Sequence, residues 1–401
     1  METLFTRTPA VLSMSLQATL GGGGTERLHR YFFAPSNIQG GQTAPQLTSS
    51  SFTGTPVQLP KAFAREKGHA VSETRRGCSM EAKAPLKTPG GEVADCETAH
   101  PLLRKILKGM LKPYVKRNPT AAQVMSILGE RELIRFDHFA FRTFGVEGYG
   151  IDSIAKMFLD LGYRQRDELR FPAKKLRAYW YSPPKEAVEE SGASMTDGPL
   201  PRVFISELLV DQLSEKAQAI IKKYTSEGRQ LAGHAALSSL VHGLPWRTPE
   251  LKDYVELTRE SEYAAWTLVN GYALNHTTIT CHDFVNFTMG PGMALRDVVN
   301  FLYREQIALN GAGGSLINVS PDKLLLQAST EADIAPFTFA GGHVADVPLS
   351  YIEFAHREVL PEFENLPLEE IYDCHRREGF EVGNADNIFE STSIKRSHAT
   401  T

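Results

Sequence analysis

Residues 136–142 read FDHFAFR, and residues 274–280 read LNHTTIT. Each stretch places a histidine inside a short run of apolar or β-branched side chains, and such a run predicts a buried β-strand. Side chains alternate between the two faces of a strand, so His138 and Arg142 point to the same side of the first strand. Two buried strands that each hold a histidine are the starting point for predicting the fold.

A weak internal repeat begins at these two strands. The first is followed by a predicted helix near 154–161 and strands near 178–181 and 203–210, and the second by a predicted helix near 295–302 and strands near 323–327 and 350–355. The last strand of each series holds a glutamate, Glu207 in the first and Glu353 in the second. The pattern predicts an α+β fold whose sheet core consists of two βαβββ-type modules, about 131–212 and 268–360, with surrounding helices.

Helices are expected outside the two modules. Apolar side chains at helical spacing follow Pro101, and Asn118 before Pro119 is typical of a helix that begins with proline at its first position. Residues 213–267 are expected to form a helical insert between the modules, and residues 361–395 a C-terminal segment.

Residues 1–83 differ in composition from the rest of the chain. Ser, Thr, Gly, Gln and Pro predominate there, and basic residues outnumber acidic ones. This composition is typical of an organellar transit peptide followed by a disordered linker, and its Ser and Thr content favours a plastid, either chloroplast or amyloplast. The remaining residues, 84–401, are expected to form the catalytic domain.

The overall composition argues against several classes of protein. The 401 residues are 42% hydrophobic, which is enough for a sizeable core, and the formal net charge of −4 argues against binding to nucleic acid or anionic lipid. No apolar run reaches the roughly 18 residues that a membrane helix needs. The four cysteines lie far apart, which argues against a disulfide framework or a thiolate zinc site. The oligomeric state cannot be predicted from the sequence.

Two histidines and one carboxylate are candidate metal ligands, although spacing alone does not select these two histidines. The neutral imidazoles of His138 and His276, together with the carboxylate of Glu353, would form the set that binds Fe(II) and leaves positions for a chelating substrate and O2. His282 is a competing ligand, because it shares a face with His276 if that strand extends far enough. His343, just before the closing strand, is another.

Three further polar side chains have roles to be decided. Glu207 is either a fourth ligand or a structural carboxylate paired with an arginine. His356 is expected on a helix or loop, in a peripheral role. The planar fork of Arg142 suits a carboxylate, and it lies at most about 13 Å along the strand from His138. That separation suits the far carboxylate of a short dicarboxylic acid.

Four motifs together resemble the family of 2-oxoadipate dioxygenase/decarboxylases, over roughly residues 101–393. They are FDHFAFRT at 136–143, FISEL at 204–208, NHTT at 275–278 and YIEF at 351–354. The resemblance implies a sheet like that of the vicinal oxygen chelate superfamily. It also implies that His138, His276 and Glu353 bind Fe(II), and that Arg142 binds a carboxylate of the substrate.

The same resemblance implies a substrate, a reaction and further site residues. A small 2-oxo dicarboxylic acid, 2-oxoadipate, would react with O2 to give 2-hydroxyglutarate and CO2 in lysine breakdown. The C-terminal segment would contribute to the substrate pocket through Gly383, Asn384 and Ser391. In the region of Gly383 and Asn384 this sequence departs from the bacterial pattern of small apolar and hydroxyl residues.

Two other functions are compatible with these residues. One is a vicinal-oxygen-chelate isomerase or lyase that uses zinc, manganese or nickel as a Lewis acid, and a ligand role for Glu207 would favour it because such enzymes often have four protein ligands. The other is a plastid binding or regulatory protein without catalysis. Inward-pointing charges in one cavity argue against the second alternative, because they are costly to keep without a function.

Overall fold

The computed structural model describes residues 101–132, 134–184, 200–226, 235–241, 243–287 and 293–393. The predicted transit segment and linker, residues 1–83, lie outside these described residues. No helix in the described part is long and apolar enough to cross a membrane. The elements that position the site therefore all come from residue 101 onward.

The first module follows the predicted order of elements. It consists of β1 (Phe136–Phe144), α3 (Ile151–Asp160), β2 (Arg164–Phe171), β3 (Leu176–Ser182) and β4 (Arg202–Leu208). The position of β2 was not predicted, because six of its eight side chains are exposed and mostly charged or polar. Such a strand at the edge of a sheet lacks the apolar alternation by which a strand is recognised in a sequence.

The second module has the same order, with one addition. It consists of β5 (His276–Thr280), α8 (Ala294–Arg304), β6 (Asn318–Val319), β7 (Leu325–Ser329) and β10 (Tyr351–Arg357). A hairpin of β8 (Ile334–Thr338) and β9 (Val344–Pro348), which was not predicted, is inserted between β7 and β10. The expectation of a helix or loop at His356 is wrong, because this residue is buried within β10.

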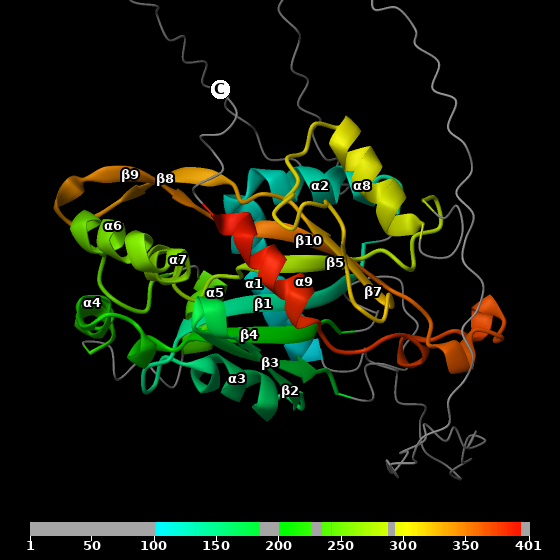
Figure 1. Ribbon diagram of the computed structural model, residues 1–401, viewed down its shortest axis with the longest axis horizontal. Coiled ribbons are helices and arrows are strands. Elements are labelled where there is room, and N and C mark those ends of the chain that lie inside the picture. The colour runs from blue at the N-terminus through cyan, green and yellow to red at the C-terminus, as the bar shows by residue number, and fades with distance from the viewer. Residues whose placement is uncertain are drawn as a thin grey trace, which may run out of the picture. The chain divides into compact units, whose positions relative to one another are not determined.

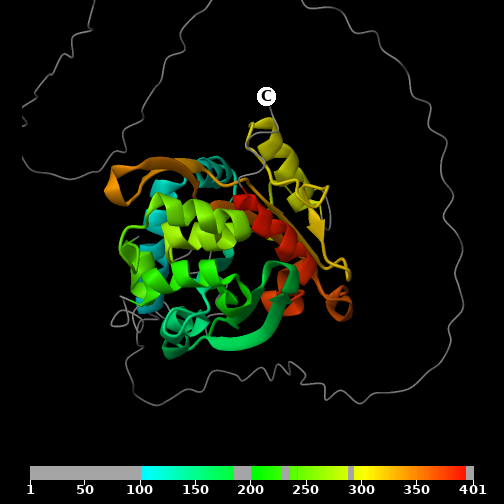
Figure 2. The ribbon, with the colours of Figure 1, turned by 60° about the vertical axis from the view of Figure 1, so that its left-hand side comes forward.

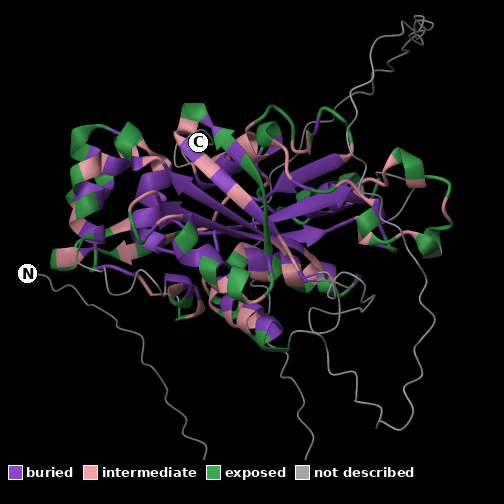
Figure 3. Cartoon of the chain, turned by 90° about the horizontal axis from the view of Figure 1, so that it is seen from below, coloured by how far each residue is buried: buried purple, intermediate pink, exposed green. Residues whose placement is uncertain are grey.

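The two modules join into a single eight-stranded sheet in the order β2-β3-β4-β1-β5-β10-β7-β6 (Figure 1). β1 and β5 pair antiparallel at the centre, and each pairs in parallel with the last strand of its own module. From either edge to the centre, the strands thus follow the same order within their module, with the second strand at the edge and the first strand at the centre. The six strands between the two edge strands β2 and β6 are buried along most of their length (Figure 3).

Helices cover both faces of the sheet. The remaining ones are α1 (Pro101–Arg117), α2 (Pro119–Gly129), α4 (Glu215–Thr225), α5 (Ala235–Val241), α6 (Leu251–Glu260), α7 (Glu262–Asn270) and α9 (Val382–Phe389). α9 contacts β2 at one edge of the sheet and β6 and β7 at the other, so the sheet curls around this helix as a half-barrel (Figure 2). We call the face that α9 covers the concave face. α3 packs on the other face, where Phe158 contacts Phe141 of β1.

Asn118 precedes α2, which begins at Pro119 as predicted. Its side chain does not cap the helix. Instead, Asn118 Nδ2 donates to the carbonyl of Tyr114 at 2.6 Å, and Asn118 Oδ1 accepts from the backbone amide of Ser350 at 2.9 Å. The junction between α1 and α2 therefore holds the start of β10, the strand that presents Glu353.

Candidate metal centre

The side chains of His138, His276 and Glu353 converge on the concave face. The Nε2 atoms of the two histidines lie 3.3 Å apart, and Glu353 Oε2 lies 3.1 Å from His276 Nε2 and 3.7 Å from His138 Nε2. All three residues are buried. They form the one group of potential metal ligands in the described part of the chain whose ligand atoms lie within 4.8 Å of one another. Two imidazoles and a carboxylate in this arrangement fit a divalent transition metal.

Each histidine is oriented by the residue that precedes it. His138 Nδ1 lies 2.7 Å from Asp137 Oδ1, and His276 Nδ1 lies 3.0 Å from Asn275 Oδ1. Both acceptors require the proton on Nδ1, which leaves the Nε2 lone pair of each ring for a metal. Burial lowers the pKa of His276 to about 4, so this ring stays neutral at neutral pH.

The carboxylate is oriented by two amides. Gln327 Nε2 donates to Glu353 Oε1 at 2.5 Å, and Asn384 Nδ2 donates to Gln327 Oε1 at 3.0 Å. Burial alone would raise the pKa of Glu353, but the neighbouring histidines and Gln327 lower it below its ordinary value. The carboxylate is thus held ionised, with Oε2 directed at the two histidines. Asn384, expected to bind substrate, acts here on a ligand through Gln327.

Asp137 contacts His138 because β1 has a β-bulge. The strand pairs Phe136 with Ile279 and His138 with Thr278, so two steps along β1 match one step along β5. The extra residue is Asp137. Regular alternation would direct neighbouring side chains to opposite faces, and a bulge changes that direction. As a result, Asp137 is beside the imidazole that it orients.

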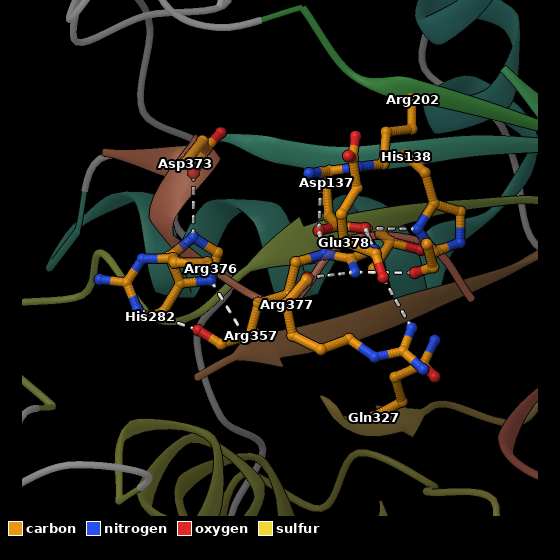
Figure 4. A network of polar contacts seen from close by, with 12 residues as sticks. Asp137, His138, Arg202, His282, Gln327, Arg357, Asp373, Arg376, Arg377 and Glu378 are labelled. Carbon is orange, nitrogen blue, oxygen red and sulfur yellow. Dashed lines mark hydrogen bonds and ion pairs between the residues drawn. The ribbon is translucent and has the colours of Figure 1, made fainter. Parts of the chain in front are cut away.

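Asp137 is also the centre of a buried ionic network (Figure 4). Arg357 donates to it from Nε at 2.6 Å and from a second nitrogen at 3.0 Å, and Arg202 lies at 3.4 Å. Burial alone would raise the pKa of Asp137, but the two arginines and His138 hold it well below its ordinary range. Arg357 also donates to the carbonyls of Arg377 and Gly379. The network therefore joins His138 to the turn that precedes Phe380.

The metal ligands open into a small pocket. Its other lining residues are mostly apolar: Phe204, Gln327, Tyr351, Phe380, Ala385, Ile388 and Phe389. The ring of Phe380 packs edge-on against His138, with the ring centroids 4.8 Å apart. α9 and the turn before it thus form one wall of the site.

Arg142 is buried at the end of the concave face beyond the ligands. Its guanidinium donates to Thr392 Oγ1 at 3.0 Å and to the carbonyl of Phe389 at 3.4 Å. It also lies over the rings of Tyr263 and Trp266, about 5 Å from each centroid. No carboxylate lies within 4.0 Å of it among the described residues. A buried cation that lacks a carboxylate partner can pair with an anionic ligand.

Several predicted residues lie outside the pocket. Gly383 is exposed, with open space where a side chain would lie. Ser391 is buried, but its hydroxyl contacts Asn310 Nδ2 and Ser329 Oγ, each at 2.9 Å. His282 follows the end of β5 and contacts Asp373 at 3.4 Å, and His343 is exposed at the tip of the β8–β9 hairpin. The structure brings none of these four side chains to the ligand group.

Glu207 does not reach the ligand group either. It lies on the other face, where its carboxylate accepts from Arg177 Nε at 2.5 Å and from the backbone amide of Ile151 at 2.9 Å. Of the two roles left open, the structural carboxylate paired with an arginine is therefore the one that the structure shows.

The register explains why Glu207 is not the counterpart of Glu353. In the second module, His276 pairs with Tyr351 on the neighbouring strand, and Glu353 lies two residues beyond Tyr351. In the first module, His138 pairs with Arg202, and Glu207 lies five residues beyond Arg202. An odd offset reverses the face of a strand. The residue two beyond Arg202 is Phe204, which lines the pocket.

Other residues of the site were not predicted from the sequence. Asp137, Gln327, Tyr351 and Phe380 were given no role. Tyr351 had a usable signal, because it lies two positions before Glu353 and so shares its face. The other three depend on a bulge, on the pairing of β7 with β10, and on the path of the C-terminal segment.

Comparisons with known proteins give a consistent result. A family model described as 2-oxoadipate dioxygenase/decarboxylase matches residues 95–366. The chloroplastic/amyloplastic 2-oxoadipate dioxygenase/decarboxylase of Oryza sativa subsp. japonica is 50% identical over 329 residues, which cover 81% of this chain and 88% of the rice protein. The chloroplastic protein of Arabidopsis thaliana with the same enzyme name is 46% identical over 348 residues, covering 86% and 91%.

A solved structure is also similar. The crystal structure of the hydroxyglutarate synthase from Oryza sativa, in complex with 2-oxoadipate, has a TM-score of 0.70 and 51% sequence identity. The match covers 74% of this chain and 93% of that chain.

Proposed function

The chain belongs to the 2-oxoadipate dioxygenase/decarboxylase family, and on that premise we propose that it uses Fe(II) to convert 2-oxoadipate and O2 into 2-hydroxyglutarate and CO2. The buried group of His138, His276 and Glu353 is the observation that carries the proposal. Both atoms of O2 are accounted for in 2-hydroxyglutarate, so no separate reductant or second 2-oxo acid is needed. The reaction would belong to lysine breakdown.

The three ligands fit the metal that this reaction needs. Each presents one atom to the centre, and the other polar atom of each is held by Asp137, Asn275 or Gln327. The hydroxyl of Thr278 also lies 3.0 Å from His138 Nε2. When bound, Fe(II) would supply the redox chemistry that couples reduction of O2 to decarboxylation of a 2-oxo acid. The protein contributes a fixed set of donors and a single negative charge.

The rest of the pocket would orient the substrate and exclude water. Arg142 provides the positive charge for the carboxylate at the far end of 2-oxoadipate. Apolar lining from Phe204, Phe380, Ile388 and Phe389 leaves little room for water beside the reacting carbons. The duplicated βαβββ order and the curled sheet support assignment to the vicinal oxygen chelate architecture. Residues 84–401 would form the catalytic domain.

Oxygen consumption tests the proposed function directly. The full chain, loaded with Fe(II) under anaerobic conditions, is expected to consume O2 with 2-oxoadipate and to release CO2 in equal amount. A panel of 2-oxo acids of different chain length tests the substrate in the same assay. Turnover of a 2-oxo acid that continues without O2 would instead support an isomerase or lyase.

Arg142→Met is expected to lower kcat/KM for 2-oxoadipate by about a hundredfold, because a buried carboxylate loses its charged partner. The methionine keeps much of the side-chain volume, so Fe(II) binding should be unchanged. Steady-state oxygen uptake and metal content measure the two effects. Arg177→Met is the matched control, because it removes an arginine from the other face of the sheet. Equal kcat/KM values in wild type and Arg142→Met would refute the role of Arg142.

We propose that residues 1–83 direct the chain to a plastid. The composition of that segment and the chloroplastic or amyloplastic relatives support the proposal. A fusion of residues 1–83 to a fluorescent protein should accumulate in chloroplasts of leaf cells. Fluorescence in mitochondria or the cytosol would show that another compartment is the destination.

A further inference from the structure

We propose that the hydroxyl of Tyr351 is a second donor, beside Arg142, for the far carboxylate of the substrate, and that it sets the preference for dicarboxylic over monocarboxylic 2-oxo acids. The inference rests on the proposed function, which it deepens by naming a residue for substrate selection. Three features carry it: the position of Tyr351 along the sheet, the fixed orientation of its ring, and two buried donor atoms without acceptors.

The register places Tyr351 and Arg142 on the same side of His138 and Glu353, with Tyr351 level with His276. Arg142 lies four residues after His138 on β1, and Tyr351 lies two residues before Glu353 on β10. β1 is antiparallel to β5, and β10 is parallel to β5, so both steps lead toward the same end of the sheet. An even number of residues keeps each side chain on the concave face. A substrate extended from the ligands toward Arg142 would therefore pass Tyr351, which lines the pocket.

The ring of Tyr351 has a fixed orientation. It stacks on the imidazole of His276 with the ring centroids 4.7 Å apart and an interplanar angle of 26°. Its backbone carbonyl accepts a hydrogen bond from the Tyr114 hydroxyl at 2.5 Å. The hydroxyl of Tyr351 is thus presented at a set distance from a metal ligand, as required of a group that distinguishes substrates by length and end group.

Two buried donors on this part of the concave face have no acceptor. Neither the hydroxyl proton of Tyr351 nor the Nε proton of Arg142 has an acceptor within the described part of the chain, and both residues are at most 2% exposed. The guanidinium of Arg142 interacts with the hydroxyl of Tyr351, so the two groups lie together. Buried donors are normally satisfied, so their pairing is expected to come from a ligand. A carboxylate offers acceptors for both and balances the charge of Arg142.

The experiment compares 2-oxoadipate with 2-oxohexanoate, which has the same chain length but a methyl group in place of the far carboxylate. Binding of each to the full chain with Mn(II) is measured by anaerobic titration calorimetry, and turnover is measured as Fe(II)-dependent oxygen uptake. Tyr351→Phe removes the hydroxyl and keeps the ring on His276. We expect about tenfold to a hundredfold weaker binding of 2-oxoadipate, the loss typical of a hydrogen bond to a charged group. Binding of 2-oxohexanoate should change by less than about threefold.

The matched control is Tyr181→Phe. Tyr181 is also buried and its hydroxyl also lacks a partner among the described residues, but it neighbours Trp180 in β3 and so faces away from the concave side. The control should leave both affinities unchanged.

Three outcomes would overturn the inference: no preference for 2-oxoadipate in the wild type, an unchanged preference in Tyr351→Phe, or equal losses for both acids. A different result would contradict the proposed function. A wild-type protein that prefers 2-oxoadipate in calorimetry but consumes no O2 with Fe(II) would contradict the dioxygenase reaction, while the effect of Tyr351→Phe on binding would still decide the inference.

Discussion

Glu353→Ala is expected to abolish Fe(II) binding and reduce oxygen uptake with 2-oxoadipate to the level of the metal-free protein. Glu353 is the single carboxylate in the ligand group, so its loss leaves a divalent ion with two neutral imidazoles and no negative charge from the protein. Metal content per chain after anaerobic loading and gel filtration measures the first effect, and an oxygen electrode measures the second. His138→Ala and His276→Ala should give the same result.

The matched control for Glu353→Ala is Glu207→Ala. Both variants remove a buried glutamate from the last strand of a module, but Glu207 contacts Arg177 and the start of α3 on the other face. Glu207→Ala should lower the midpoint of thermal unfolding and leave one Fe(II) per chain. Full metal content and activity in Glu353→Ala would refute the ligand assignment.

Asp137→Asn is expected to weaken both the metal site and the fold. Asparagine keeps an acceptor for His138 Nδ1 but removes the negative charge beside Arg357 and Arg202. Breaking a buried ion pair on one side costs about 3–5 kcal/mol, and loss of the partner that orients a metal-binding histidine typically costs about tenfold to a hundredfold in metal affinity. Thermal unfolding and Fe(II) titration below the unfolding range measure the two effects separately.

Asp373→Asn provides the comparison for Asp137→Asn. Asp373 belongs to the same region and contacts His282, not His138. Its replacement should leave Fe(II) affinity unchanged. If Asp137→Asn is less stable but binds Fe(II) like the wild type, then Asp137 supports only the fold and does not position His138.

Strand alternation was sufficient to predict part of the site. It placed His138 and Arg142 on one side of β1, and Glu353 inward on β10, and the structure shows all three on the concave face. The sequence pattern alone did not distinguish His276 from His282 as the metal ligand, because the length of the strand was unknown. The resemblance to the family made that choice. In the structure β5 ends at Thr280, so His282 no longer follows the alternation of the strand.

The rest of the site depends on features that alternation cannot reveal. The bulge places Asp137 beside His138, whereas regular alternation predicts opposite faces. The match between Glu207 and Glu353 failed because a sequence repeat does not give the register between strands. A shift of the register by an odd number of residues moves a side chain to the other face of the sheet. Gly383 and Ser391 were assigned from the family and lie outside the pocket, because the direction of each side chain on α9 and beyond was not known.

Phe204 and Glu353 occupy equivalent positions in the two modules, and the difference between them has an electrostatic consequence. If both modules carried a carboxylate at this position, the ligand group would hold two negative charges and would neutralise a divalent cation. With Phe204 in the first module and Glu353 in the second, the protein supplies one negative charge, and a bound divalent ion would keep a net charge of +1. Such a centre attracts an anionic oxo acid and discriminates against neutral or cationic molecules. With a metal ion bound, the asymmetry between the two halves of the sheet would thus select for the charge of the substrate before any contact with Arg142.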